Sequence, residues 1–480
     1  MTFTGEQPPA RLNLARHCLS GKPAEKTALI AAGRETERWS YGALEDAVLR
    51  LSEGLRRQGV TDGERLFIRM GNSPDYALLF FAANAAGAVP VPASSLLTPR
   101  EVDFILRHSG VRFIAWDGAL PLPQMDGQRL FGPEDIAAMK RAPAGSYADT
   151  AADDPAYLIF TSGTSGTPKG VLHGQRTLWG RRPMYQGWYG IGPDDVMLHT
   201  GAFNWTYTLG TGLFDPFVNG CTSVVYTGER DISIWARLMT EHGVTIFGSV
   251  PGLYRQLLRS GFRQAGMLRH GLTAGEAMAP PILNAWRQQT GLEIYEGLGM
   301  SEISTYISTS PSVAIKPGSP GKPQPGRAVR ILESGEIGVH RSDPGLFLRY
   351  WGEDTPEDEW FATGDLAEID ADGYVWSRGR ADELMNAGGY RVSPVEVEAV
   401  LLQHPQVAEA GVREWRVSDS ATIIAAFLVP QPGARLDEEA VLAFVRDRLA
   451  AYKCPKQLWF VPALPRTPNG KLIRKSLEKP

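Results

Sequence analysis

The chain has 480 residues, of which 43% are hydrophobic and 21% charged, and its formal net charge is −4. This length predicts at least two domains, and the composition is typical of a globular protein. The slight acidic excess gives no reason to expect a nucleic-acid partner, and the three cysteines, Cys18, Cys221 and Cys454, are spaced too widely for a metal or disulfide framework.

The N-terminal part of the chain alternates between helix and strand patterns. Residues 41–58 are predicted to form a helix because their apolar side chains fall on one stripe, made of Leu44, Val48, Leu51 and Leu55. A short strand is expected at 66–70 and a second helix at 75–86. This alternation favours an α/β architecture.

The most apolar long window, residues 76–97, is interrupted by Asn84, Pro90 and Pro92. It therefore predicts a core helix followed by a strand, and no membrane span. The N-terminus shows no basic region followed by an apolar one, so no signal peptide is expected. A reducing cytoplasm is the expected setting.

Residues 157–170 read Tyr-Leu-Ile-Phe-Thr-Ser-Gly-Thr-Ser-Gly-Thr-Pro-Lys-Gly, which is a strand pattern followed by a loop. Glycines let backbone N–H groups converge on one point, hydroxyls add donors, and Lys169 adds a positive charge, so the loop suits a polyphosphate. It is not a Walker loop, because the lysine is followed by Gly170, where a Walker loop has Ser or Thr. The alternative is a flexible linker, but the apolar pair Val171-Leu172 follows at once and favours a loop between two strands.

The C-terminal part is predicted to form a smaller, separate domain. A hairpin is expected over 367–377, with Asp372-Gly373 as its turn, and a domain boundary near 379–390. The segment Ser393-Pro394-Val395-Glu396 has the form of a capping box at a helix start. A strand at 421–429 and a helix at 437–449 complete a compact unit.

Five segments in fixed order resemble the adenylate-forming superfamily, which includes acyl- and aryl-CoA synthetases, peptide-synthetase adenylation domains and luciferases. They are 157–170, Tyr295-Glu-Gly-Leu-Gly-Met-Ser-Glu302, Trp360-Phe-Ala-Thr-Gly-Asp365, Gly379-Arg-Ala-Asp382 with Gly388-Gly-Tyr-Arg391, and Pro468-Asn-Gly-Lys471. Leu298 stands where many relatives carry an aromatic residue, and this run looks closer to the benzoate-CoA ligase branch.

The resemblance implies a mixed α+β fold of the α/β class. Residues 1–381 would form a large N-terminal domain of several subdomains, whose sheets are flanked by helices and which holds the ATP and acyl pockets. Residues 382–480 would form a small mobile α+β domain, joined at a hinge near Asp382.

The resemblance also implies the residues that bind ATP, Mg²⁺ and CoA. Glu302 and Thr161 would be the metal ligands, and Lys471 would be the catalytic lysine of adenylation, assisted by Thr161 and Lys169. Asp365 and Arg380 would bind the ribose, and Gly388 and Gly389 would face the CoA tunnel. The remaining nucleotide contacts would come from Ser162, Gly163, Thr164, Ser165, Gly166 and Thr167, from Gly275, Glu276 and Ala277, and from Glu296, Gly297, Leu298, Gly299, Met300 and Ser301.

Each of these residues also has an ordinary structural explanation. Taken alone, Glu302 would be a solvated surface carboxylate, Asp365 a turn residue and Lys471 a solvated cation. Trp205 and Tyr207 are equally well explained as core aromatics or as walls of the acyl pocket. Two bulky aromatics at the pocket would favour a small or aromatic acid.

The expected function is ATP-dependent activation of a carboxylic acid to an acyl adenylate, followed by an acyl-CoA thioester, with release of AMP and pyrophosphate. The expected partners are the acid, ATP and CoA, with a homodimer left open. A stand-alone adenylation enzyme that loads the phosphopantetheine of a carrier protein is the main alternative. A nucleotide-binding regulator without catalysis and a kinase-type NTPase that releases ADP are the others.

Overall fold

The computed structural model describes residues 2–161, 168–229, 231–263, 266–387, 390–418, 421–467 and 472–480. The chain divides into two compact units. The first unit comprises Met1–Ala328 with His340–Glu359, and the second comprises Val329–Val339 with Trp360–Pro480. The predicted hinge at Asp382 lies inside the second unit, and the boundary expected there stays a prediction.

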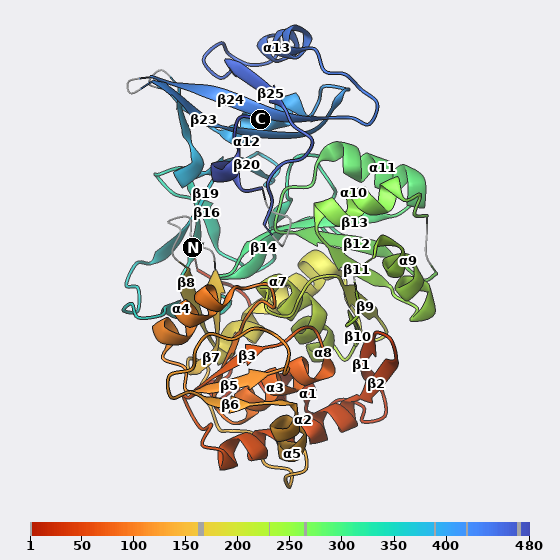
Figure 1. The fold of residues 1–480 in the computed structure, drawn as a ribbon, viewed down its shortest axis with the longest axis vertical. Coiled ribbons are helices and arrows are strands. Elements are labelled where there is room, and N and C mark those ends of the chain that lie inside the picture. The colour runs from red at the N-terminus through yellow and green to blue at the C-terminus, as the bar shows by residue number, and fades with distance from the viewer. Residues whose placement is uncertain are drawn as a thin grey trace. The chain divides into compact units, whose positions relative to one another are not determined.

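The main sheet of the first unit has nine strands among the described residues (Figure 1). Six neighbouring strands are parallel, which places their carboxyl ends along one edge. The order is β15 (Lys322–Pro323), β14 (Ser304–Ser308), β13 (Glu293–Met300), β12 (His270–Ala274), β11 (Ile246–Ser249), β9 (Val196–His199), β10 (Thr222–Tyr226), β1 (Thr27–Ala32) and β2 (Thr36–Ser40).

Two smaller sheets contain the other named strands among the described residues of the first unit. One is parallel, in the order β4 (Val89–Pro92), β3 (Arg65–Arg69), β5 (Phe113–Trp116) and β6 (Arg129–Phe131). The other is antiparallel, in the order β18 (Arg349–Tyr350), β8 (Lys169–Gly174) and β7 (Pro155–Thr161). The strand expected at 66–70 is β3, which begins and ends one residue earlier.

The helices of the first unit begin at recognisable sequence signals. Ser40 accepts a hydrogen bond from the backbone of Ala43, and Ser73 accepts one from Tyr76 ahead of a proline at the first turn. Both predicted helices are confirmed to within one residue. The helices are α1 (Leu14–Leu19), α2 (Tyr41–Arg57), α3 (Pro74–Ala85), α4 (Pro99–Ser109), α5 (Pro133–Met139), α6 (Arg182–Met184), α7 (Thr206–Leu209), α8 (Asp215–Val218), α9 (Ile232–Glu241), α10 (Pro251–Arg259) and α11 (Pro280–Thr290), with a 3₁₀-helix at Gln175–Arg181 and π-helical turns at Tyr185–Tyr189 and Gly210–Phe214.

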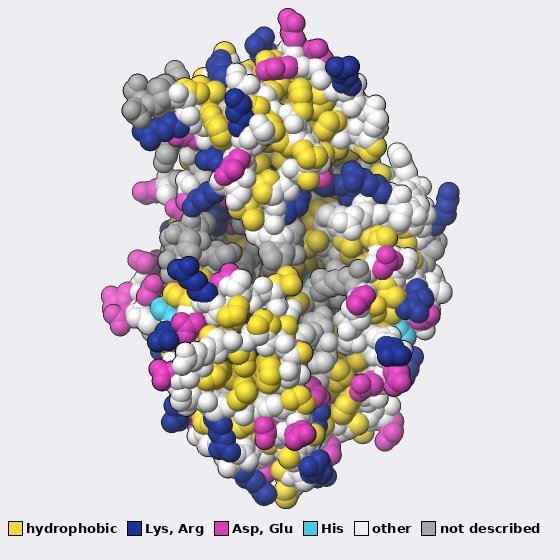
Figure 2. Space-filling view, viewed as in Figure 1, with side chains coloured by type: hydrophobic (Ala, Val, Ile, Leu, Met, Phe, Trp, Pro, Cys, Tyr) yellow, Lys and Arg dark blue, Asp and Glu magenta, His cyan; other side chains and the backbone are white. Residues whose placement is uncertain are grey.

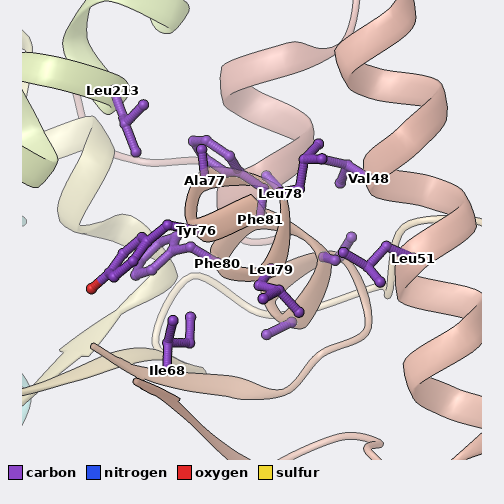
Figure 3. Close-up of a cluster of buried hydrophobic side chains, with 14 of the residues drawn as sticks. Val48, Leu51, Ile68, Tyr76, Ala77, Leu78, Leu79, Phe80, Phe81 and Leu213 are labelled. Carbon is purple, nitrogen blue, oxygen red and sulfur yellow. The ribbon is translucent and has the colours of Figure 1, made fainter. Parts of the chain in front are cut away.

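Helix α3 lies at the centre of the largest hydrophobic core. Its side chains from Tyr76 to Ala85 are buried on every face, which explains why this segment is apolar all round. In Figure 3 the labelled side chains of α3, from Tyr76 to Phe81, lie with Val48 and Leu51 of α2 on one side and Leu213 on another. The apolar window is therefore a core helix followed by strand β4, as the sequence predicts.

The second unit consists of three small sheets and two α-helices within its described residues. The hairpin predicted around Asp372-Gly373 is formed by β19 and β20. The elements are β16 (Val329–Ile331), β17 (Glu336–His340), β19 (Trp360–Ile369), β20 (Val375–Arg380), a 3₁₀ turn at Ala381–Glu383, β21 (Met385–Ala387), β22 (Tyr390–Val392), α12 (Pro394–Leu401), β23 (Val407–Ser418), β24 (Ala421–Pro430), α13 (Glu438–Arg446), β25 (Gln457–Phe460) and a 3₁₀ turn at Arg474–Ser476.

The start of α12 corrects one detail of the sequence prediction. Ser393 caps the helix by accepting a hydrogen bond from the backbone N–H of Glu396, at 3.4 Å. The reciprocal half of the expected capping box is replaced, because the Glu396 carboxylate accepts a hydrogen bond from Lys453 Nζ at 2.6 Å. A nearby cation competes for the carboxylate that the motif would direct to the backbone.

Among the residues that the structure describes, no helix is both long enough and apolar enough to cross a bilayer. The three cysteine side chains are free thiols and buried. Figure 2 shows acidic and basic side chains interspersed over the face that it draws.

Replacing Phe80 with alanine should destabilise the first unit by about 3–5 kcal/mol, because the substitution empties the centre of this core. The Phe80 ring lies 5.4 Å from the Phe214 ring and 5.9 Å from those of Phe81 and Tyr157. Urea unfolding followed by tryptophan fluorescence measures the loss. Leu96→Ala, at a side chain that is 67% exposed, is the control and should stay near the wild type. Equal stability of Phe80→Ala and the wild type would contradict this account of the core.

Candidate functional site

The phosphate loop predicted from the sequence connects two paired strands. Strands β7 and β8 are antiparallel, and Thr161 pairs with Lys169 at the end of the hairpin next to the loop. The intervening loop residues lie outside the described part of the chain. The linker interpretation is wrong for this segment, since both flanks are strands of one sheet.

Lys169 is exposed at the start of β8, and its ammonium lies over an aromatic ring. Its Nζ is 4.7 Å from the centroid of the Tyr350 ring, within the range of a cation–π contact. The same tyrosine belongs to β18, which pairs with β8, so the sheet itself brings the two residues together.

Glu302 lies on the turn that connects β13 to β14. Met300 and Ser304 pair at the base of this turn, and Glu302 is only 8% exposed. The Tyr350 hydroxyl donates a hydrogen bond to Glu302 Oε1 at 2.9 Å. Burial and the neighbouring carboxylate raise the pKa of the Tyr350 phenol above its ordinary value, so the hydroxyl stays protonated and can donate. The surface-carboxylate interpretation of Glu302 is therefore wrong.

The backbone of this turn is held by two groups from elsewhere in the first unit. The N–H of Phe347 donates to the Glu302 carbonyl at 2.7 Å. His173, four residues after the loop lysine, contacts the Ser301 carbonyl through Nε2 at 2.8 Å. A carbonyl can only accept, so Nε2 carries the proton and Nδ1 accepts from Thr177. Burial lowers the pKa of His173 to about 3, which keeps the ring neutral.

The residue that closes the turn has an unusual backbone conformation. Ser304 has φ 70°, in the left-handed region that normally favours glycine or asparagine. Its hydroxyl accepts a hydrogen bond from Arg181, and Arg181 forms a buried ion pair with Asp215 at 2.6 Å. Tyr189 also donates to Asp215, at 2.6 Å. These interactions hold the Ser304 backbone in its strained conformation. Strained backbone conformations are frequent at functional sites.

The segments assigned to adenine lie at the carboxyl ends of β12 and β13. Ala274 pairs with Gly297, so Gly275, Glu276 and Ala277 follow directly beside the strand that carries Glu296. Glu296 is buried, and its Oε1 accepts a hydrogen bond from the backbone N–H of Met278 at 3.0 Å. Burial raises the pKa of Glu296 to about 7. Ligands commonly bind at this edge of parallel sheets.

The other residues predicted in that run continue the same strand. Leu298, Gly299 and Met300 belong to β13, with an irregularity between Leu298 and Gly299, and Ser301 begins the turn. A Cβ on Gly299 would come within 2.5 Å of the Ser304 carbonyl oxygen. Glycine at this position therefore permits the tight return of the chain behind Glu302.

The two predicted pocket aromatics lie against the adenine segment. The Trp205 ring packs over Gly275, where a Cβ would be 3.1 Å from its Cζ2 atom, and its centroid is 5.2 Å from that of Tyr207. The Tyr207 hydroxyl donates to the carbonyls of Ser249 and Leu272, at 3.3 Å each. His199 completes the cluster, with its ring centroid 4.3 Å from that of Tyr207.

This aromatic cluster adjoins the turn of Glu302. The hydroxyl of Thr206, between the two pocket aromatics in sequence, lies 3.5 Å from the Ser301 hydroxyl. The segment that carries these aromatic side chains therefore contacts the turn that carries the buried carboxylate.

In the second unit, the structure brings Asp365 and Arg380 together. They are paired residues of β19 and β20, and Arg380 Nη1 lies 3.4 Å from Asp365 Oδ1 and 2.9 Å from the Thr363 carbonyl oxygen. Gly364 has φ 78°, and a Cβ there would lie 2.7 Å from the guanidinium. Arg380 Nε also contacts Asp382 Oδ1 at 3.3 Å. The turn-residue interpretation of Asp365 is wrong, because it lies within a strand.

Several predicted site residues lie outside the described part of the chain: Ser162, Gly163, Thr164, Ser165, Gly166 and Thr167 of the loop, Gly388, Gly389 and Lys471. Their roles stay predictions. Sequence reasoning missed Tyr350, His173 and Arg181. His173 has a weak signal, because it follows the loop lysine on the same strand, whereas Tyr350 is 48 residues from Glu302 and has none.

The donors present suit Mg²⁺ bound together with a nucleotide. Within the described residues, no three His, Cys, Asp or Glu side chains are grouped to hold a metal ion by themselves. Glu302 and Thr161 instead offer one carboxylate and one hydroxyl, both oxygen donors. Mg²⁺ prefers such a set completed by phosphate oxygens and water, so the residues fit this metal.

Glu296→Gln should remove a pH dependence from the stability of the protein. The pKa of Glu296 is about 7 in the folded state and about 4.3 in an unfolded chain, so its contribution to stability is full below the lower value and is lost as the pH rises through the higher one. Glutamine cannot ionise. The free energy of unfolding of the variant, relative to the wild type, should rise by about 3 kcal/mol between pH 4 and pH 8.

Urea unfolding at several pH values measures this difference. Glu439→Gln, at an exposed carboxylate of α13, controls for the loss of one negative charge. Parallel stability curves for Glu296→Gln and the wild type would contradict the burial effect.

Two family models together match most of the chain. The family model described as "AMP-binding enzyme" matches residues 15–349, and "AMP-binding enzyme C-terminal domain" matches 396–471. A 3-hydroxybenzoate–CoA/4-hydroxybenzoate–CoA ligase of Thauera aromatica is 31% identical, with 97% of each chain covered. Among solved structures, a benzoate CoA ligase from Burkholderia xenovorans LB400 has a TM-score of 0.86 and 30% identity, covering 96% of this chain and 99% of its own.

The anthranilate CoA ligase AuaEII, solved in complex with anthranoyl-AMP, has a TM-score of 0.85 and 28% identity, with 97% and 96% of the two chains covered. The family match spans well over half of the chain, and the likeness to adenylate-forming enzymes noted in the sequence is confirmed. The chain belongs to the AMP-binding enzyme family.

Proposed function

We propose that this protein is an ATP-dependent ligase that joins an aromatic carboxylic acid to coenzyme A through an acyl adenylate, releasing AMP and pyrophosphate. The observation that carries the proposal is the contact between Thr206 and Ser301, which joins the segment of the expected aromatic wall, Trp205 and Tyr207, to the turn that carries the buried carboxylate of Glu302. An acid packed on that wall has its carboxylate next to the phosphate site. Relatives named for hydroxybenzoate, benzoate and anthranilate support an aromatic substrate.

In the first half-reaction, an oxygen of the substrate carboxylate attacks the α-phosphorus of ATP, and the bond to the pyrophosphate oxygen breaks. Residues 161–169 bind the departing pyrophosphate. The positive charge of Lys471 stabilises the negative charge that develops around the α-phosphate. Glu302 and Thr161 would hold Mg²⁺, which would neutralise charge on the phosphate oxygens. Asp365 and Arg380 bind the ribose hydroxyls, a task suited to a two-oxygen acceptor and a fixed cation.

In the second half-reaction, the CoA thiol attacks the carbonyl carbon of the acyl adenylate and AMP leaves. The C-terminal part of the chain turns about Asp382, so that Gly388 and Gly389 face the thiol in place of Lys471. Glycines suit a face that the pantetheine arm must approach closely. The three free, buried thiols are compatible with a cytoplasmic setting.

A carrier protein's phosphopantetheine is the alternative acceptor of the acyl group. CoA is favoured because the relatives that cover nearly the whole chain are named CoA ligases. Thioester formation measured with free CoA and with a holo-carrier protein separates the two.

A panel of benzoate, hydroxybenzoates, anthranilate and short aliphatic acids tests the proposal, with AMP release scored in the presence of CoA. We expect AMP with the aromatic acids and much less with the aliphatic ones. ADP as the product would indicate a kinase-type reaction, and absence of any acid-dependent nucleotide product would indicate a pure nucleotide-binding protein. Either result contradicts the proposal.

Lys471→Ala should reduce acid-dependent pyrophosphate exchange into ATP by at least about 10²-fold, because a preorganised charge at the developing negative charge is lost. Thioester formation from a supplied acyl adenylate and CoA should stay near the wild-type rate. Lys479→Ala removes another positive charge of the same C-terminal segment and serves as the control. Equal losses in both half-reactions would show that Lys471 has no role specific to adenylation.

Asp382→Pro should impair one half-reaction much more than the other, since proline fixes φ near −65° at the proposed hinge. Asp382→Ala is the matched control: it also removes the contact with Arg380 but leaves φ free. Single-turnover rates of adenylation and of thioester formation report the two steps separately. If proline and alanine have the same effect, the hinge lies at another residue.

A further inference from the structure

We propose that Tyr350 is a positioning residue that holds the Lys169 ammonium and the Glu302 carboxylate in place. The lysine then contacts the phosphates, and the carboxylate the metal, of the same bound nucleotide. The proposal rests on the proposed function, which places both residues at the phosphate site.

The backbone places Tyr350 beside the loop strand. Tyr350 pairs with Val171, two residues after Lys169, and the N–H of Trp351 donates to the Gly170 carbonyl at 2.7 Å. A Cβ on Gly170 would lie 2.9 Å from the Trp351 Cβ, so glycine at this position permits the two strands to approach closely. The position of the tyrosine ring is therefore set by the sheet and not by a flexible loop.

The ring and the hydroxyl of Tyr350 contact groups of opposite charge. The ring face receives the Lys169 ammonium, with Nζ 4.7 Å from the centroid, and the hydroxyl donates to Glu302 Oε1 at 2.9 Å. A cation over the ring makes the hydroxyl a stronger donor, and a carboxylate accepting from the hydroxyl enriches the ring in electrons. Each contact strengthens the other, as expected for a polarisable chain of interactions.

This arrangement prepares both groups before the nucleotide binds. Lysine has a long, flexible side chain, and ordering it in advance lowers the entropic cost of phosphate binding. The hydroxyl fixes the orientation of the Glu302 carboxylate by holding its Oε1, which is the role of hydrogen bonds to metal-binding carboxylates. A tyrosine that served packing alone would need its ring, which lies 4.8 Å from that of Phe347, but not its hydroxyl.

Two substitutions separate the two contacts. Tyr350→Phe keeps the ring under Lys169 and removes the hydrogen bond to Glu302, whereas Tyr350→Leu removes both. Mn²⁺ affinity of the enzyme–ATP complex, measured by electron paramagnetic resonance, reports the metal site. ATP affinity in EDTA, measured by isothermal titration calorimetry, reports the metal-independent contact of the lysine with the phosphates.

We expect Tyr350→Phe to weaken Mn²⁺ binding about tenfold while leaving metal-free ATP affinity within about twofold of the wild type. Tyr350→Leu should weaken Mn²⁺ binding similarly and should also weaken metal-free ATP binding about threefold or more. Unchanged Mn²⁺ affinity in Tyr350→Phe, or equal ATP affinities in the two variants, would overturn the proposal.

Tyr147→Phe is a matched control. The Tyr147 hydroxyl also donates to a glutamate, Glu45 of α2, and also at 2.9 Å. Loss of this hydroxyl should leave both affinities unchanged, and a loss equal to that of Tyr350→Phe would overturn the assignment. Acid-dependent AMP release by the wild type, measured on the same preparations, distinguishes a failure of the proposed function from a failure of the positioning role. A wild type that releases no AMP contradicts the proposed function, while an active wild type with a normal Tyr350→Phe contradicts only the positioning role.

Discussion

The whole site depends on how one carboxylate, Glu302, is held at a hairpin turn away from water. Removing a charged group from water is costly unless fixed dipoles and donors replace its hydration. Here the Tyr350 hydroxyl contacts the carboxylate, and a backbone N–H and the His173 ring hold the main chain on either side of it. The turn is thus arranged before any substrate binds, which is the condition for electrostatic stabilisation without reorganisation.

The support behind this turn comes from distant parts of the first unit. Ser304 closes the hairpin in a left-handed conformation, and its hydroxyl is tied to the Arg181–Asp215 ion pair, whose side chains are 2% and 0% exposed. Asp215 follows the π-helical turn at Gly210–Phe214, and its partner Tyr189 ends the other π-helical turn. Such turns are frequent at functional sites because they redirect side chains within a helix. Buried hydrogen bonds and an ion pair thereby hold one short turn in a strained conformation.

The sequence predicts the framework well where local physics dominates. Helices α2 and α3 follow from an apolar stripe and from an apolar window that Asn84, Pro90 and Pro92 interrupt. The hairpin around the phosphate loop follows from strand patterns on both sides. The order of the motifs also predicts Glu302 and Asp365 as site residues, and these roles stay predictions. Competition between two donors for one acceptor is harder to predict. The Glu396 carboxylate, expected to cap the start of α12, accepts a hydrogen bond from Lys453 instead.

The contacts that tune the site could not be predicted, because they join residues that are remote in sequence. Nothing near Tyr350 indicates that its hydroxyl reaches a carboxylate 48 residues earlier. The raised pKa of Glu296 is a consequence of burial at the carboxyl end of β13, and it depends on the assembled sheet rather than on neighbouring letters. Local patterns establish which groups are available, and tertiary packing determines what each group contacts.

Transfer of an oxygen isotope tests the central claim most directly. When benzoate labelled with ¹⁸O in its carboxylate is converted in the presence of ATP and CoA, attack of the carboxylate on the α-phosphorus predicts AMP that carries one ¹⁸O atom, detected by mass spectrometry. Label in inorganic phosphate with ADP as the nucleotide product, or AMP without label, would contradict this account.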